Sequence, residues 1–349
     1  MEHRNSTVLS RTGHLAQVEL SALGTVAHEF FHAWNIERIR PRSLEPFDFE
    51  AANVSQELWF GEGFTSYYDD LAMVRAGVID LNEFTSRMAS LINTVTNSPG
   101  RRFYSPIEMS MQAPFVDAAV SVDPQNRSNT FISYYTWGAA LGLALDLAIR
   151  DRFPDKSLDD FMRETWVRFG KEFIPYEVGD LEDTLGDVVE DPAFAAEFFD
   201  TYVRGVYRDP AVPVPDYGRL LALAGFAFED RADRPWVGNP GLEYGADGAR
   251  VQAPIRIGSP LYDAGIERED VIVSVDGTVL TDAGAWGRAL ARYRPGDRAL
   301  VVWRSRGDEF EEQLVVGSDP NLSILPLEAT GGTLSDSARA FRGRWLEAR

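Results

Sequence analysis

Apolar residues recur at helical spacing through the first 215 residues, so this part of the chain is predicted to be mainly helical. One helix is expected to begin near Ala22, with Ser21 as its cap, and to end before Pro41. Further segments with the same periodicity are expected at 57–71, at 71–97 with a break at Gly77, and at about 131–150, 157–170, 180–188 and 192–205.

The pattern changes near residue 234, where glycines multiply and short apolar runs replace the helical spacing. The runs 248–251, 271–275 and 300–303 are predicted to be strands bounded by turns. A proline-rich segment at 209–215 precedes the change and is typical of a boundary. The sequence therefore predicts an α+β protein, which divides into a mainly helical domain over 1–215, a connector over 216–233, a small β-rich domain over 234–320 and a partly helical C-terminal tail over 321–349.

Composition narrows the classes of partner. The 349 residues include 54 acidic and 34 basic side chains, a net charge of -20, which disfavours binding to nucleic acid or to anionic membranes. No apolar run reaches the roughly 18 residues of a membrane span, and the longest candidate, Trp137 to Ile149, contains Asp146 and is predicted to be a core helix. The absence of cysteine excludes disulfides and cysteine-ligated zinc, and it leaves the compartment open between cytoplasm and periplasm.

The candidate chemistry begins with His28-Glu29-Phe30-Phe31-His32. On a helix, His28 and His32 lie one turn apart on the same face, so both imidazoles can reach one metal ion. Glu29 lies beside them, where it can hold a water without binding the metal. This is the H-E-x-x-H arrangement of a zinc peptidase. The preceding stretch, Leu20 to Ala27, is small and apolar and is predicted to be buried.

A third ligand is expected at Glu62. This residue stands in an apolar, aromatic helical segment, and a carboxylate buried there is costly unless it is paired or bound to a metal. Gly61 and Gly63 flank it and leave room for close approach of a partner helix. For Asp69 and Asp70, further along the segment, two roles stay open: orienting a ligand histidine, or a plain surface position.

Three segments, HEFFHAWNIERIRP, LWFGEGFTSYYDDL and NTFISYYTWGAALGLALDLAIR, closely resemble the glycyl aminopeptidase family, in order and in spacing. Members of this family are gluzincin metallopeptidases with a C-terminal PDZ domain. The resemblance implies a thermolysin-like catalytic domain. In it, His28, His32 and Glu62 bind one zinc ion and Glu29 is the general base.

The third segment also carries the tyrosine that the family uses to stabilise the oxyanion. The resemblance implies that this residue is Tyr135. Related enzymes often have lysine where this chain has Trp137, and this departure keeps Tyr134 as an alternative to Tyr135.

The segments GSPLYDAGI, EDVIVSVDG and RPGD are similar to bacterial PDZ domains. The resemblance implies that the domain captures a peptide C-terminus or an extended strand. The loop near Trp236-Val237-Gly238 would then present amides to the carboxylate. The alternative is that this domain only packs on the catalytic one, or that its groove is closed.

The first residues, Glu2-His3-Arg4-Asn5-Ser6-Thr7, resemble the family element G-x-x-E-H-R-N-S-T. The resemblance implies that Glu2 binds the free α-amine of a substrate, and that a catalytic sheet and an N-terminal β-domain precede this element. The chain is therefore expected to be N-terminally truncated, with helices that expose apolar surface.

The expected function is a zinc aminopeptidase that removes small residues such as glycine or alanine from peptides. Two alternatives remain open. One is a zinc endopeptidase to which the PDZ domain delivers substrate, and the other is a non-catalytic, peptide-binding fragment.

Overall fold

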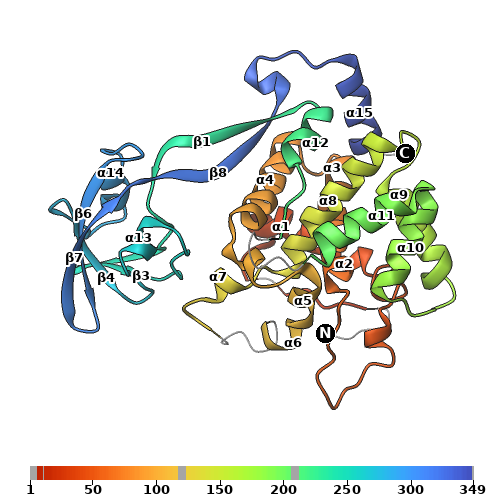
Figure 1. Ribbon diagram of the computed structural model, residues 1–349, viewed down its shortest axis with the longest axis horizontal. Helices are drawn as coiled ribbons and strands as arrows, with labels where there is room; N and C mark the ends of the chain where they lie inside the picture. The colour runs from red at the N-terminus through yellow and green to blue at the C-terminus, as the bar shows by residue number, and fades with distance from the viewer. Residues whose placement is uncertain (1–5, 11, 117–122, 206–211, 348–349) are drawn as a thin grey trace.

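The computed structural model describes residues 6–10, 12–116, 123–205 and 212–347. They form a helical domain and a smaller β-rich domain, which are joined by a long two-stranded arm (Figure 1). About 48% of the chain is helical, and the strands are concentrated in its C-terminal part. The predicted α+β class is therefore confirmed, with a mainly helical domain followed by a β-rich one.

Among the described residues, the helical domain has helices at the predicted positions and four further helices, within 101–130 and at 217–223, where none was predicted. They are α1 (Leu15–Phe31), α2 (Leu58–Gly61), α3 (Gly63–Arg75), α4 (Leu81–Asn97), α5 (Pro106–Met111), α6 (Ala113–Val116), α7 (Arg127–Thr130), α8 (Tyr134–Arg152), α9 (Leu158–Thr165), α10 (Val178–Val189), α11 (Pro192–Phe198) and α12 (Tyr217–Leu223). Short π-helical turns, Trp166–Gly170 and Phe199–Val203, extend α9 and α11, and 3-10 turns occupy Arg42–Leu44, Pro99–Arg102 and Leu327–Thr330.

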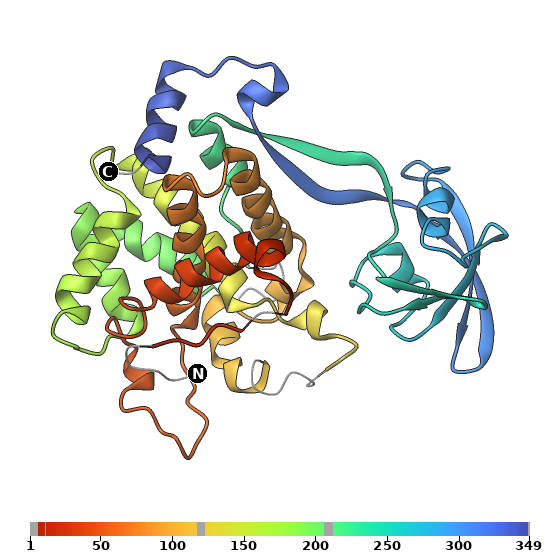
Figure 2. The ribbon, with the colours of Figure 1, turned by 180° about the vertical axis from the view of Figure 1, so that it is seen from behind.

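Helix α1 differs from its prediction in its start and in its burial. Its N-cap is His14, whose Nδ1 accepts a hydrogen bond from the backbone of Ala16, whereas Ser21 lies inside the helix. The predicted burial is wrong, because Leu20 and Leu23 are 40% and 41% exposed. Helix α1 lies on the outside of the domain (Figure 2), and none of the described elements covers this apolar face.

Helix α8 forms the centre of the helical domain. Its apolar residues point in all directions and are buried, which is the pattern of a core helix. The stretch Arg127–Arg152 is apolar enough to cross a membrane by length and composition, yet 78% of its most apolar window is buried within the protein. Asp146 and Arg150 pair at 2.8 Å inside this core. These observations agree with the predicted core helix.

The β-rich domain is built on one antiparallel sheet in the order β2-β3-β4-β6-β7, with β5 paired to β4. Its core is separate from that of the helical domain. Asp276 and Gly277, both with positive φ, form the tight turn between β4 and β5. The elements are β2 (Leu242–Gly245), β3 (Gly248–Val251), α13 (Pro260–Asp263), β4 (Val271–Val275), β5 (Thr278–Val279), α14 (Ala285–Leu290), β6 (Arg298–Ser305) and β7 (Asp308–Val315).

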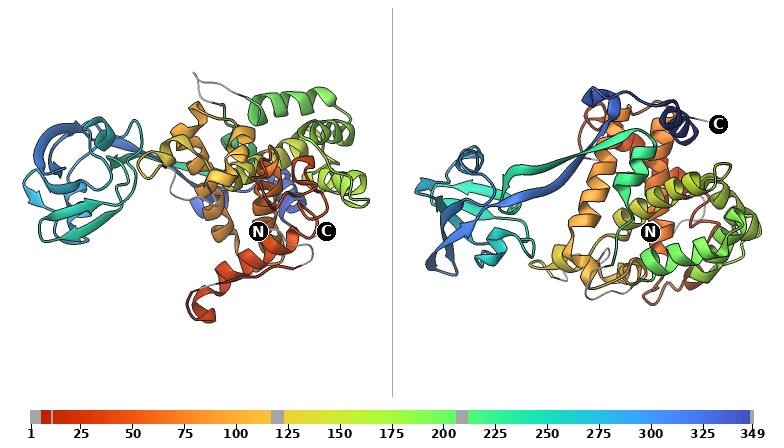
Figure 3. Two further views of the ribbon diagram at one scale, coloured as in Figure 1. Left: turned by 90° about the horizontal axis from the view of Figure 1, so that it is seen from below. Right: turned by 45° about the horizontal axis from the view of Figure 1, so that its top comes forward.

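The arm consists of β1 (Phe226–Trp236) and β8 (Gly317–Pro326), which pair antiparallel. Strand β1 follows α12, and β8 leads back to the last helix, α15 (Asp336–Leu346). The chain therefore leaves the helical domain along one strand and returns along the other (Figure 3). Both ends of the predicted segment 234–320 lie within this arm.

Helix α15 packs back on the helical domain through Trp345. This side chain is fully buried and makes edge contacts with the rings of Phe84 and Phe226, at centroid distances of 5.7 and 6.1 Å. Its Nε1 donates a hydrogen bond of 2.8 Å to the hydroxyl of Tyr67 on α3. The C-terminal segment is thus part of the main core.

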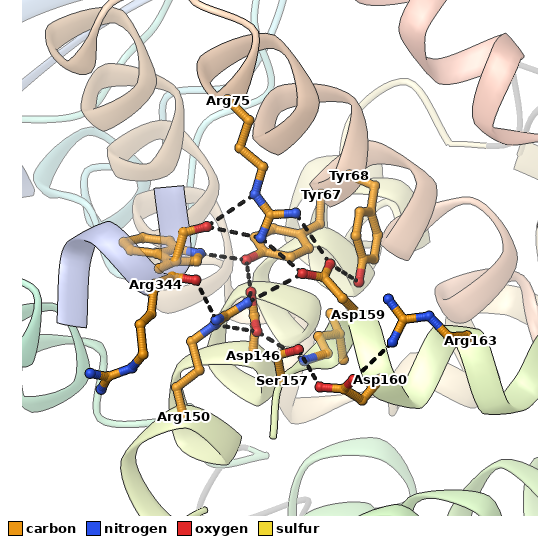
Figure 4. A network of polar contacts seen from close by, with 12 residues as sticks. Tyr67, Tyr68, Arg75, Asp146, Arg150, Ser157, Asp159, Asp160, Arg163 and Arg344 are labelled. Atoms are coloured by element: carbon orange, nitrogen blue, oxygen red, sulfur yellow. Dashed lines mark hydrogen bonds and ion pairs between the residues drawn. The ribbon is translucent and has the colours of Figure 1, made fainter. Parts of the chain in front are cut away.

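Two arginines cap the end of α15 (Figure 4). Arg75 donates to the backbone carbonyl of Trp345 at 2.9 and 3.0 Å, and Arg150 donates to that of Arg344 at 2.7 Å. Cationic side chains at these last carbonyls satisfy acceptors that the helix itself leaves open. Asp159 pairs with Arg75 at 3.0 Å and links this cap to α9.

Replacing Trp345 with phenylalanine is expected to lower the free energy of unfolding by about 1–3 kcal/mol. The smaller ring leaves a cavity, and the Tyr67 hydroxyl loses its donor. Urea denaturation measures the change, with Trp286→Phe in the β-rich domain as the control because Trp286 is only half-buried. Equal stability of the Trp345 variant and the wild type would show that α15 lies outside the cooperative core.

Candidate metal centre

The end of α1 brings two imidazoles together. The Nε2 atoms of His28 and His32 are 3.0 Å apart. His28 Nδ1 lies 3.0 Å from Asp69 Oδ2, and His32 Nδ1 lies 3.0 Å from the backbone oxygen of Asn35. Both of these oxygens accept a hydrogen from Nδ1. In its neutral form, each imidazole therefore turns an unprotonated Nε2 toward the same point.

Glu62 completes the cluster from the break between α2 and α3. Its Oε2 lies 3.3 Å from His28 Nε2 and 3.1 Å from His32 Nε2. The side chain of Glu62 is only 17% exposed. The structure thus brings together the three residues that the sequence predicted as ligands.

The glycines beside Glu62 allow two close approaches. A Cβ atom on Gly61 would lie 2.5 Å from Ile36 Cδ1, in the turn that follows α1. A Cβ atom on Gly63 would overlap the backbone of Gly138 on α8. The predicted close approach of a partner helix is therefore confirmed, and this partner is α8.

The donor set fits a cation such as zinc. Two imidazole nitrogens and one carboxylate oxygen are common zinc ligands, and donors about 2.1 Å from a tetrahedral ion lie about 3.4 Å from one another. The observed separations of 3.0, 3.1 and 3.3 Å are close to this value. Without a positive charge between them, the lone pairs of His28 and His32 would face each other and the Glu62 carboxylate at close range.

The acidic side chains around His28 and His32 also favour a cation between the two imidazoles. Burial alone would lower the pKa of His28, but hydrogen bonds to Asp69 and Glu62, together with their charges, raise it to about 9. Burial alone would raise the pKa of Glu62, but hydrogen bonds from His28 and His32 and their charges lower it to about 2. A proton and a metal ion therefore compete for the same position at neutral pH.

Asp69 and Asn35 contact the candidate ligands His28 and His32. The sequence left Asp69 open between two roles and did not predict Asn35. Asp69 lies seven positions after Glu62, two helical turns along the same face, so its contact with His28 follows from helical spacing. Ser66, one turn after Glu62, also approaches His28 Nδ1, at 3.5 Å. Asn35 contacts His32 through its backbone oxygen, so the contact cannot be predicted from a pattern of side chains in the sequence.

Tyr135 lies beside the cluster, in the first turn of α8. Its ring is 6.0 Å from that of His28, with an interplanar angle of 22°. Tyr134 stacks on Tyr135 at 5.1 Å but is 2% exposed and belongs to the core. Of the two candidates, Tyr135 is the one that lies beside His28 and is not fully buried.

The remaining predicted residues are Glu29 and Glu2. Glu29 is half-buried, and the hydroxyl of Thr7 donates a hydrogen bond of 3.1 Å to its Oε2. Its carboxylate is not part of the ligand cluster, as expected for a general base. Glu2 lies outside the described residues.

Residues 21–141 match the M61 glycyl aminopeptidase family. The sequence of this segment is therefore similar to that of M61 glycyl aminopeptidases. The M61 segment contains the candidate ligands His28, His32 and Glu62, together with Glu29 and Tyr135. This match confirms the resemblance to the glycyl aminopeptidase family that the three sequence segments indicated.

A solved structure confirms the fold around the M61 segment. An aminopeptidase N family protein from Idiomarina loihiensis aligns with 98% of this chain at a TM-score of 0.78 and 22% sequence identity. The alignment covers 57% of that protein, so the chain spans little more than half of its length.

Two further likenesses are partial. A probable periplasmic serine endoprotease DegP-like from Rhizobium meliloti (strain 1021) is 36% identical over 96 residues, which are 27% of this chain and 19% of that protein. The HtrA3 PDZ domain bound to a phage-derived ligand covers 31% of this chain and 99% of its own, with 19% identity and a TM-score of 0.18, too low to bear on the fold.

Proposed function

We propose that this chain is a zinc-dependent aminopeptidase that removes small N-terminal residues, glycine or alanine, from peptides. The observation that carries the proposal is the convergence of His28, His32 and Glu62 within 3.3 Å of one another, with Tyr135 beside them. The M61 assignment of residues 21–141 supports the peptidase class. The preference for glycine or alanine rests on the family resemblance.

Zinc bound by the two histidines and Glu62 would polarise the scissile carbonyl and acidify a water. Glu29 accepts a proton from the attacking water and delivers it to the leaving amine. The Tyr135 hydroxyl donates a hydrogen bond to the carbonyl oxygen as that oxygen becomes negative. Asp69 keeps the ring of His28 in the orientation that this arrangement needs.

The exopeptidase character depends on Glu2 in this proposal. Its carboxylate pairs with the α-ammonium group of the substrate and so places the first peptide bond at the metal. Without this contact the same centre would serve the alternative function, a zinc endopeptidase. A peptide-binding fragment without activity is the remaining alternative.

The test uses the full chain, purified with zinc. Metal analysis should find one zinc per chain, and the protein should hydrolyse glycyl or alanyl chromogenic amides until a chelator removes the metal. Cleavage of N-acetylated peptides would favour the endopeptidase. Absence of both zinc and hydrolysis would overturn the proposal and leave the peptide-binding fragment.

We also propose that residues 234–320 form a PDZ-type domain that captures a peptide C-terminus. A cavity of about 540 Å³ lies at the end of the edge strand β7, next to Trp236. The guanidinium of Arg256 lies 4.3 Å from the centre of the Trp236 ring, and burial lowers its pKa. The charge of Asp319 partly offsets this effect on the pKa of Arg256. Arg256 lines the cavity, where its guanidinium could pair with the carboxylate of a peptide C-terminus.

A labelled peptide with a free C-terminus tests this second proposal. Replacing Arg256 with glutamine is expected to weaken binding about 10- to 100-fold, the loss of one charge-assisted hydrogen bond or ion pair. Amidation of the peptide should weaken binding to wild type equally. Arg250→Gln, an exposed arginine on β3, is the matched control. Equal affinity of the wild type for free and amidated peptides would exclude carboxylate capture.

A further inference from the structure

We propose that Asn35 and Ile36 form a clamp that fixes the distance between the ligands His32 and Glu62. These two residues belong to the turn after α1 and are positioning residues. The inference rests on the proposed metal-dependent function. In it, the turn after α1 holds the segment that carries His32 at a set distance from the segment that carries Glu62.

The clamp is needed because each ligand stands at a helix end. His32 is the C-cap of α1, and Glu62 lies between α2 and α3. The backbone bonds of each residue stay within its own segment: Glu62 is bonded to Leu58 and Ser66, and His32 to His28 and Glu37. Their Nε2–Oε2 separation of 3.1 Å therefore depends on what joins the turn after α1 to α2.

Asn35 makes this connection with both its backbone and its side chain. Its backbone oxygen accepts from His32 Nδ1 at 3.0 Å. Its Nδ2 donates toward the backbone oxygens of Phe60 and Gly61, at 3.0 and 3.1 Å, and lies 3.2 Å from Thr65 Oγ1. Asn35 is fully buried. A single residue thus contacts one ligand directly and holds the segments on both sides of the other.

The second half of the clamp is Ile36, which adopts an unfavourable backbone conformation. Its φ is +82°, a value that β-branched residues rarely take and that costs about 1–3 kcal/mol. Such strain persists only where the surroundings impose it. Here the side chain fits against Gly61, where a Cβ atom would lie only 2.5 Å from Ile36 Cδ1.

Asn35 and Ile36 both contact Gly61, the residue before Glu62. Asn35 binds the Gly61 carbonyl, and Ile36 packs where Gly61 has no side chain. Gly61 directly precedes Glu62, so a shift of the turn would move this carboxylate relative to His32. Residues that support ligands in this way typically contribute about 10- to 100-fold to metal affinity.

The test compares Asn35→Ala and Ile36→Gly with wild type in the full chain. Zinc affinity is measured by competition with a chelator, the visible spectrum is recorded with Co²⁺ as the bound metal, and thermal denaturation reports stability. Both variants are expected to bind zinc about 10- to 100-fold more weakly and to show an altered Co²⁺ spectrum. For Ile36→Gly this loss should occur with little loss of stability, because glycine relieves the backbone strain.

Asn93→Ala is the matched control. Asn93 also joins two segments through its amide, with bonds of 2.8 Å to the backbone oxygen and nitrogen of Leu322, but it lies on α4 away from the ligands. It should lower stability and leave zinc affinity unchanged. Unchanged affinity and spectrum in Ile36→Gly would overturn the clamp, even if Asn35→Ala failed to fold. A wild type that binds neither zinc nor Co²⁺ would overturn the proposed function and the clamp with it.

Discussion

Replacing Glu29 with glutamine is expected to leave zinc bound and to lower the rate of peptide hydrolysis by about 10²–10⁴-fold, the range for a lost general base. Glutamine keeps the size and the hydrogen-bonding reach of glutamate but cannot accept the proton of the attacking water. Because the Glu29 carboxylate is not part of the ligand cluster, the metal content should not change. Metal analysis and initial rates on a glycyl amide measure the two effects separately.

The control for this variant is Glu19→Gln, an exposed glutamate on the same helix. It carries the same chemical change and should keep both zinc and activity. A Glu29→Gln protein with wild-type turnover would exclude Glu29 as the base. A variant that lost its zinc would instead place this carboxylate among the ligands.

Most residues of the candidate metal centre could be predicted from the sequence, because they recur at helical spacing. His28 and His32 are one turn apart, and Glu62 stands out as a carboxylate in an aromatic helix flanked by glycines. Asp69 was open between two roles, and its position two turns after Glu62 agrees with the contact that the structure shows. Asn35 was not predicted, because its link to His32 uses a backbone oxygen.

The arm and the docking of α15 could not be read from the sequence for a different reason. Most side chains of β1 are exposed or half-exposed on both faces, so the strand lacks the alternation that marks a half-buried sheet. Trp345 gives no sign of its burial in the local pattern, because its partners Phe84 and Phe226 lie far away in the chain. Helix α1 shows the opposite error, because its apolar composition was taken to indicate burial and yet Leu20 and Leu23 are exposed.

Replacing Gly138 with alanine is expected to disturb both stability and catalysis through the contact of α8 with α2 and α3. The added methyl group would overlap the carbonyl oxygen of Trp59 and the Cα atom of Gly63. Overpacking against backbone costs about 1–3 kcal/mol or more, which exceeds the gain of about 1 kcal/mol that alanine brings to a helix. The helices must therefore move apart, and Tyr135 on α8 moves away from Glu62.

The two effects of this variant can be measured separately and have a common control. A displacement of about 1 Å in a catalytic group can lower a rate about 100-fold, so glycyl amide hydrolysis should fall while chemical denaturation reports the loss of stability. Gly179→Ala on α10 makes the same substitution where no atom lies within 4 Å of the new methyl group, and it should keep activity and gain slightly in stability. If Gly138→Ala behaved like Gly179→Ala, the close approach of α8 to α2 and α3 would not be what places Tyr135 beside the candidate metal centre. If activity and stability both fall in Gly138→Ala and not in Gly179→Ala, the geometry of the candidate site depends on the close packing at Gly138, which is itself neither a candidate ligand nor a catalytic residue.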